Sequence, residues 1–545
     1  MTTNPTAMLE KLHDNDPAIR RKAVRELSPF PQADVVEALV ESLGDPNKGV
    51  QNTAIETLSQ MRHPLVIEGL MPVIRGSDLN TRNAGMSILK SFGPMAVAYL
   101  IEAIKKAGDV DEIIQVLVVL GNIASPIATD AVLPYVAHDD DNVKTTAVEA
   151  LGKIQDRKAT KALINAYHQT DILKYAILEA LGNISESDAK PLVMGAIKSE
   201  DVLECFSGIG AMGAMEDPEF IAPLFQRLAA EEDLGTRRLI VKSLAQIEEA
   251  NIGSLAKHID RKAMRPILVG LLEQQNSAEY IYIVKTAAAL QDETYAGALL
   301  TALESHENEI VDIANQGLFV LAEKAVKASL DRLGRVTPPT AIKILEFLER
   351  VPHPETSRVV TAFSQHAEDA VRQAIARTLT ANPSEMSFQT LARMLQAPDP
   401  DEMVRKFAVA GIRKMLQYDG ALSALIGALQ DPNGHVRREA ASALGSSHSK
   451  QVVEPLSNQL MKEPYGDVRE ASAAALAARK EPEITKKLCE LLDSDNSRVR
   501  ETIAKTIWAS GATNAVDSLI QKLSDKEWRV VVNACQSLER MKDMN

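Results

Sequence analysis

The chain repeats itself with a period of about 31 residues along nearly its whole length. Each unit contains a polar turn, an aliphatic residue, a mostly basic or polar residue and an Ala-rich apolar stretch. Taking the residue after the aliphatic position as an anchor gives spacings of 29–33 residues wherever the series is unbroken. Such a period is typical of stacked two-helix repeats. The anchors are Arg20, Gln51, Arg82, Gln115, Lys144, Lys174, Glu204, Arg237, Ile283, Asp312, Ile342, Arg372, Arg405, Arg437, Arg469, Arg500 and Val531.

Each unit holds two apolar-periodic stretches of about ten residues, and each stretch gives a helix with one buried stripe. The turn aspartate predicts a cap for the second helix. The glycine of pairs such as Leu151-Gly152 predicts a left-handed helix end. Because one hairpin cannot bury its own apolar face, neighbouring repeats must stack. We therefore expect an all-α solenoid, a superhelical stack of about 17 two-helix repeats with essentially no sheet, in which Ala440, Ala441, Ala473 and Ala504 are buried.

Asp431 to Gly445 (DPNGHVRREAASALG) carries the repeat in its clearest form. This pattern resembles the HEAT-like repeat, in the short variant named after phycobilisome lyases. The resemblance implies an armadillo-like helical solenoid. It also implies that the arginines at the anchors, Arg405, Arg437, Arg469 and Arg500, pair with turn acids of adjacent repeats as a structural ladder.

The repeat loses its register between Arg237 and Ile283, which are 46 residues apart. We expect an extra helical piece around Arg265 to Gln274. The sequence therefore divides into an N-terminal repeat run over residues 1–250, irregular repeats with an inserted helix over 251–360, and a C-terminal repeat run over 361–545. No Gly/Ser or Pro linker separates the three segments.

Motifs that resemble chemical sites have structural explanations here. The glycines of GIGAMG, from Gly208 to Gly213, spell a dinucleotide-binding fingerprint but fall within and after a predicted helix, so close helix packing explains them better. Asp140 in an acidic turn is interpreted as a helix cap rather than a cation ligand. The three cysteines, which lack metal or redox spacing, are interpreted as buried reduced thiols: Cys205, Cys489 and Cys535. We expect no catalytic residue, no metal and no cofactor.

The formal net charge is -14. Residues 361–545 hold 24 basic and 24 acidic residues, so residues 1–360 carry the whole excess of negative charge. Nucleic-acid binding depends on neutralising phosphates with Lys and Arg, so the charge balance argues against it. No apolar run approaches the ~20 residues needed to span a bilayer, and residues 1–12 lack the pattern of a secretory signal. We expect a cytoplasmic protein with no membrane, nucleic acid or small-molecule substrate as partner.

The first hypothesis for function is a non-catalytic scaffold or adaptor that binds one or more proteins on the concave surface of the solenoid, in bacterial signalling or complex assembly. The resemblance leaves a second hypothesis, a bilin lyase of the phycobilisome type or its subunit. A third is a nucleic-acid-binding helical-repeat protein, with which the zero net charge of the C-terminal run is compatible. Fold alone does not choose among them.

Four residues near the irregular interval are candidates for protein binding: Arg265, Tyr280, Tyr282 and Tyr295. Tyrosine and arginine are enriched at binding hot spots. Two alternatives remain open, since the tyrosines could instead fill a wedge between differently oriented runs or lie there by chance.

Overall fold

The computed structural model describes residues 5–76 and 78–544. The chain is 77% helical, and the described residues form no strand. They divide into two compact units, Met1–Leu290 and Gln291–Asn545. The division of the sequence at residues 250 and 360 stays a prediction.

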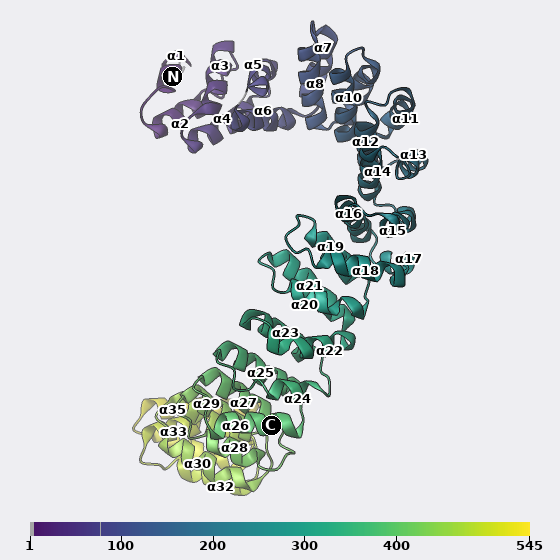
Figure 1. Cartoon of the computed structure of the whole chain (residues 1–545). Coiled ribbons are helices and arrows are strands. Elements are labelled where there is room, and N and C mark those ends of the chain that lie inside the picture. The colour runs from purple at the N-terminus through teal and green to yellow at the C-terminus, as the bar shows by residue number, and fades with distance from the viewer. Residues whose placement is uncertain (1–4, 77, 545) are drawn as a thin grey trace. The chain divides into compact units, whose positions relative to one another are not determined.

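Figure 1 shows the α-helices along the chain and labels them where there is room. Those of the first unit are α1 (Pro5–Lys11), α2 (Pro17–Glu26), α3 (Ala33–Glu41), α4 (Lys48–Met61), α5 (Pro64–Arg75), α6 (Leu79–Phe92), α7 (Pro94–Lys106), α8 (Val110–Ile123), α9 (Thr129–Val132), α10 (Asp141–Ile154), α11 (Thr160–Gln169), α12 (Lys174–Ile184), α13 (Lys190–Ala196), α14 (Val202–Met215), α15 (Ile221–Ala230), α16 (Leu234–Ala250), α17 (Leu255–His258), α18 (Arg261–Leu272) and α19 (Tyr280–Ala289).

Those of the second unit are α20 (Ala296–Ala302), α21 (Asn308–Leu321), α22 (Glu323–Arg332), α23 (Pro338–Arg350), α24 (Thr356–Thr361), α25 (Asp369–Ala381), α26 (Glu385–Gln396), α27 (Glu402–Arg413), α28 (Ala421–Ala428), α29 (Gly434–Leu444), α30 (Val453–Lys462), α31 (Gly466–Ala477), α32 (Pro482–Leu491), α33 (Ser497–Thr506), α34 (Thr513–Gln521) and α35 (Trp528–Met544). Short 3-10 helices extend or precede several of these helices; for example, Leu133–Ala137 continues the first helix of its repeat after α9.

The helices form consecutive pairs, and within each unit every second helix contacts the second helix of the next repeat. Seventeen pairs account for every described α-helix except α17, so the predicted all-α solenoid of about 17 repeats is confirmed. The four predicted alanines on second helices, Ala440, Ala441, Ala473 and Ala504, are fully buried. The predicted caps also form. For example, the Asp140 carboxylate accepts hydrogen bonds from the backbone N–H groups of Asn142 and Val143 at the start of α10.

The irregular interval holds one additional short helix. Second helix α16 is extended to Ala250, and the four-residue α17 follows it. Next, α18 contacts both α15 and α19, as the first helix of a repeat does. The additional helical piece is therefore α17, and the predicted position around Arg265 to Gln274 falls on an ordinary first helix, which corrects that expectation.

The glycine of the Leu-Gly pairs has another role than the predicted one. Gly121, Gly152 and Gly182 lie inside helices, and left-handed backbone occurs three residues later, as at Gln155 with φ of 55°. A Cβ on Gly152 would lie 2.9 Å from the Cα of Ala180 on the next second helix. Glycine is therefore required by close helix packing, and the expectation that it ends the helix is wrong. The same close packing is found at Gly208 and Gly213 of the GIGAMG motif in α14, whereas a Cβ on Gly210 would meet no neighbour within 4 Å.

A ladder of ion pairs links successive repeats, mostly in the second unit. Each arginine donates through Nε and Nη2 to one carboxylate 25–27 residues later, at 2.7–3.0 Å, and through Nη1 to carbonyl oxygens of its own turn. The ladder pairs are Arg20–Asp45, Arg372–Asp399, Arg405–Asp431, Arg437–Glu463 and Arg500–Asp525. The implied pairing is thus confirmed for Arg405, Arg437 and Arg500. It is wrong for Arg469, because the corresponding residue in the next turn is Ser494 rather than an acid.

Because of the ladder, the stability of the folded chain depends on pH in the acidic range. The hydrogen bond from Arg500 lowers the pKa of Asp525, and that from Arg20 lowers the pKa of Asp45. A carboxylate with a lowered folded pKa contributes stability that is fully present above the unfolded pKa of about 4 and is lost as pH falls through the folded pKa. We therefore expect the Tm advantage of the wild type over Asp525→Asn to shrink as pH falls below about 4. A Tm difference that stays constant between about pH 6 and pH 3 would contradict this linkage.

Candidate functional site

Helix α14 is apolar on every side. Its only Asp, Glu, Lys or Arg residue is Glu204. One side of the helix is buried against its neighbours, whereas Val202, Leu203 and Phe206 on the other side are 74%, 66% and 44% exposed. A helix that is hydrophobic all round is normally covered on all sides. Here one side lies uncovered in the described chain.

The second helices on either side extend this exposed surface. Gly182 of α12 meets Ala211 of α14, and Gly213 of α14 meets Ser243 of α16, which sets the register of the three helices. Tyr175 lies five residues before Ala180, which packs against the preceding second helix, α10. Phe206 lies five residues before Ala211, which packs against α12 in the same way, so the two aromatic residues occupy equivalent positions in successive repeats. We call the exposed apolar residues of this region the α14 face: Ile172, Tyr175, Val202, Leu203, Phe206 and Leu234.

The one charge on α14 is held away from this surface. The Glu204 carboxylate accepts hydrogen bonds from the hydroxyls of Tyr167 and Ser199, and its other neighbour is the Lys174 ammonium at 3.7 Å. Burial and this carboxylate raise the pKa of Tyr167, so the tyrosine remains a neutral donor. The network joins the N-terminal ends of α12 and α14, and it leaves the α14 face without an unsatisfied charge.

Opposite charges flank the α14 face. The second helices α10, α12, α14 and α16 each have one small residue that packs against the preceding second helix. The position immediately before that residue holds an exposed glutamate in α10 and α12, a glycine in α14 and a lysine in α16: Glu149, Glu179, Gly210 and Lys242. Arg238 of α16 takes the place that Phe206 has on α14, and it donates to Gln274 at 2.5 Å. The face is therefore acidic on the α10 and α12 side and basic on the α16 side.

The predicted binding residues do not form one surface. Tyr280 is buried in the first unit and Tyr295 in the second, so neither side chain is accessible to a partner, and the prediction that these two bind a protein is wrong. Tyr282 is half-buried, and the Lys242 ammonium lies 5.6 Å from its ring centroid, which places it beside α16. Arg265 is exposed on α18. A binding role for Arg265 and Tyr282 stays a prediction.

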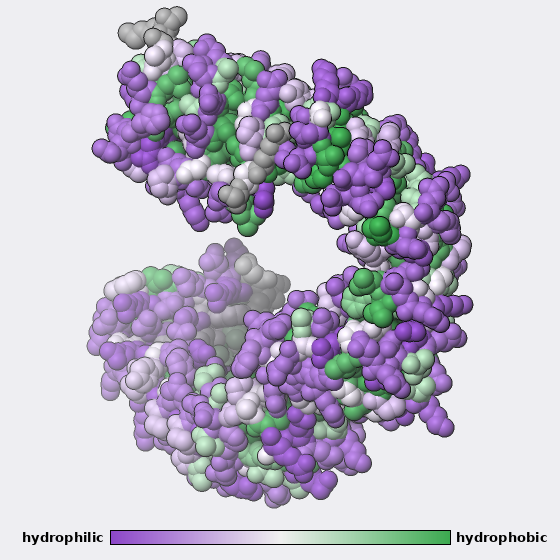
Figure 2. All heavy atoms as spheres, turned by 45° about the horizontal axis from the view of Figure 1, so that its top comes forward, coloured by the Kyte–Doolittle hydropathy of each residue, from purple (hydrophilic) through white to green (hydrophobic). Residues whose placement is uncertain are grey.

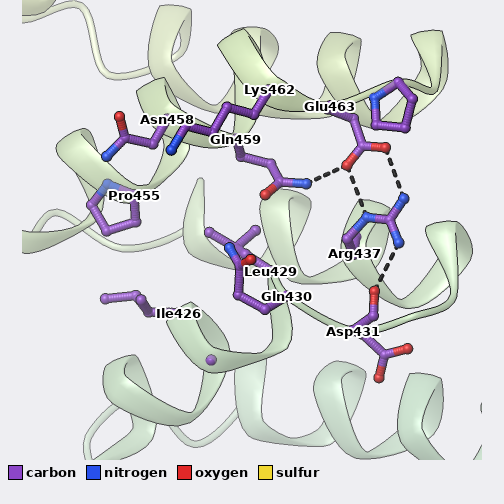
Figure 3. A pocket seen from close by; sticks show the side chains of 12 residues that line it. Ile426, Leu429, Gln430, Asp431, Arg437, Pro455, Asn458, Gln459, Lys462 and Glu463 are labelled. Atoms are coloured by element: carbon purple, nitrogen blue, oxygen red, sulfur yellow. Dashed lines mark hydrogen bonds and ion pairs between the residues drawn. The ribbon is translucent and has the colours of Figure 1, made fainter.

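A polar groove of about 600 Å³ lies between the first helices α28 and α30 (Figure 3). Arg437 and Glu463 line it, but they are already paired with each other in the ladder. The side chain of Gln459, also in the groove, donates to Glu463. These groups are bound to one another, and Asp431 is bound to Arg405, so Lys462 is the charged lining residue for which the described part of the chain shows no ion pair. A second polar groove, of about 460 Å³, borders Arg238 next to the α14 face.

The three cysteines differ in their surroundings. Cys205 is buried on α14, as predicted, and burial raises the pKa of its thiol. Cys489 is half-buried, whereas Cys535 is exposed, so the expectation of a buried thiol there is wrong. Cys535 lies outside the buried stripe of α35, which consists of Val530, Ala534, Ser537 and Met541. Among the described residues no group of three or more His, Cys, Asp or Glu side chains could hold a metal ion.

No single helix in residues 5–76 or 78–544 is long and apolar enough to cross a membrane. Only α6 and α7 together have the length and composition of a span, and the two are bent by 108° relative to each other.

Comparisons with known proteins give the following similarities. A sequence profile of HEAT repeats matches residues 5–88, 97–182, 396–477 and 485–544. The bilin biosynthesis protein PecE of Mastigocladus laminosus is 35% identical over 81 residues, which are 15% of this chain and 26% of that protein. Among solved structures, Kap95p studied with RanGDP aligns at 11% identity with a TM-score of 0.44, over 99% of this chain and 87% of that chain. The Kap95:Nup1 complex aligns at 11% identity with a TM-score of 0.42, over 100% and 88%.

Proposed function

Because the chain belongs to the HEAT-repeat family, we propose that it is a non-catalytic scaffold that holds another protein against the α14 face. The observation that supports this most directly is the exposure of six large apolar side chains, five on three adjacent second helices and Ile172 in the turn before α12. Contiguous apolar area of this kind on an otherwise hydrophilic surface marks interaction sites. Figure 2 shows how predominantly hydrophilic the visible surface is, with separate hydrophobic areas.

The flanking charges indicate the chemistry of the partner. A segment with apolar side chains at its centre would cover Leu203 and Phe206. Basic residues at one end would face Glu179, and acidic residues at the other end would face Lys242. Charge pairing at the rim fixes orientation and increases the association rate, whereas the buried apolar contacts supply most of the affinity.

A catalytic role has less support. The similarity to PecE covers 26% of that protein, and the described residues bring together no nucleophile with a base, or metal cluster, in the α14 face or in the α28–α30 groove. A nucleic-acid partner would need a basic surface, whereas the α14 face is apolar with flanks of opposite sign. We therefore propose that the partner is a protein. A bilin serves as a negative control in the binding experiments, and we expect it not to bind.

The test places a photo-crosslinking amino acid at Phe206 and, separately, at Ile252, which is 91% exposed outside the α14 face. We expect one protein to crosslink from position 206 and not from position 252. The double substitution Leu203→Ser with Phe206→Ser should then raise the Kd for that purified protein at least about tenfold, since it removes two hot-spot side chains.

The matched control is Ile127→Ser, which removes an apolar side chain that is 59% exposed elsewhere in the first unit. Ile127→Ser should keep the wild-type Tm, because most of its side chain is exposed, whereas the double variant also loses the buried part of Phe206, so circular dichroism is used to verify that it is folded before its Kd is compared. An equal loss of affinity in Ile127→Ser, or no loss in the double variant, would refute the α14 face as the binding surface.

A further inference from the structure

Arg469 is the exception in the ladder of the second unit. It is 8% exposed, and its Nη1 donates to the carbonyl oxygens of Glu463 and Pro464 at 2.9 Å, as the other ladder arginines do in their own turns. Its Nε has no hydrogen-bond partner in the part of the chain that the structure describes. The Arg469 guanidinium is therefore buried and oriented like those of the other ladder arginines, but it forms no ion pair with a carboxylate.

The residue at the place of the missing carboxylate is Ser494. In every ladder pair the acid lies six residues before the next anchor, and Ser494 lies six residues before Arg500. The serine keeps the local role of the acid, because its hydroxyl accepts a hydrogen bond from the backbone N–H of Asn496, as Asp525 accepts one from Glu527. It cannot supply the negative charge.

We propose that Arg469 and the turn at Ser494 form a binding site for a small free oxyanion, either phosphate or a small carboxylate. The planar fork of Nε and Nη2 binds two oxygens of one anion side by side, as it binds a carboxylate elsewhere in the ladder. The Ser494 hydroxyl adds a donor, and the N-terminal end of α33, which begins at Ser497, adds positive potential, while the N–H of Arg498 is already bound by the Asn496 side chain.

Electrostatics favours such a ligand. Buried charges are normally paired, because an unpaired one loses its hydration without compensation. Four arginines of the second unit meet this requirement with a carboxylate of the chain itself. At Arg469 an anion from solution meets the same requirement, and its binding links the repeat of α31 to the repeat of α33.

The test measures the Tm of the full chain in chloride, phosphate and acetate buffers of equal pH and ionic strength. We expect phosphate or acetate to raise the wild-type Tm by about 2–4 °C relative to chloride, because the ligand binds only the folded state. A response to phosphate alone identifies phosphate as the ligand class, and a response to acetate as well identifies oxyanions in general. Ser494→Asp should have the higher Tm in chloride and show no oxyanion response, because its own carboxylate pairs with Arg469.

The matched control is Asp525→Ser, which makes the same change at the pair of Arg500 and Asp525, also 25 residues apart. This variant should lose Tm in chloride and gain a second oxyanion response. The proposal is overturned if the wild type shows no response, if Ser494→Asp responds as strongly as the wild type, or if a folded Asp525→Ser gains no response.

Discussion

Arg405→Met is expected to destabilise the second unit by about 3–5 kcal/mol, since it leaves the buried Asp431 carboxylate without its counter-ion. The two side chains are 7% and 6% exposed, and the guanidinium also holds two carbonyl oxygens of its own turn. All these acceptors lose their donor together. Equilibrium unfolding in urea, followed by circular dichroism and by hydrogen exchange in α27 and α29, measures the effect.

The control for this variant is Lys505→Met. Lys505 pairs with Glu470 across the same kind of interface, but the two side chains are 48% and 40% exposed. Exposed pairs contribute about 0–1 kcal/mol, so this variant should unfold close to the wild type. If both variants cost the same, burial of the ladder would not be the source of its stabilising effect.

Gly213→Ala is expected to destabilise the first unit by about 1–3 kcal/mol, by overpacking the contact between α14 and α16. A Cβ at this position would lie 2.8 Å from the Cα and the Oγ of Ser243 and would also contact the Gln246 side chain. Because a backbone atom is among these neighbours, the helices must move apart. Urea unfolding and hydrogen exchange in α14 and α16 measure the loss.

Gly210→Ala is the matched control, three residues earlier in the same helix. A Cβ there meets nothing within 4 Å. Alanine in a helix interior is favoured over glycine by about 0.5–1 kcal/mol, so this variant should be slightly more stable than the wild type. Equal destabilisation by both substitutions would indicate that helix geometry, and not the contact with Ser243, selects the glycine.

The parts of the fold that could be predicted from sequence are those determined by local spacing. Apolar periodicity locates the helix pairs, and a turn aspartate such as Asp140 caps the helix that follows it within three residues. The ladder pairing of Arg405 followed from the resemblance to HEAT-like repeats. The same implication failed for Arg469 because its partner position belongs to the next repeat, where Ser494 takes the place of the acid found in the other turns.

The features that sequence reasoning missed depend on contacts between helices. Whether Gly152 ends a helix or admits a neighbour is decided by Ala180, which lies 28 residues away. Tyr280 gave a hot-spot signal by residue type, yet its burial is set by the packing of the helices around it. The α14 face had a usable signal, because residues 202–215 contain one charged residue in a chain that is 25% charged.

The direction of the ladder bears on how such a chain can be shortened or lengthened. Each arginine reaches toward the C-terminus to a carboxylate in the following turn, so cutting the chain between two laddered repeats leaves a buried cation on one side of the cut and a buried anion on the other. Between the arginines of α31 and α33 no such pair crosses the junction. Among the last six repeats, this junction is therefore the one at which the chain can be cut and each buried carboxylate of the ladder keeps its own arginine.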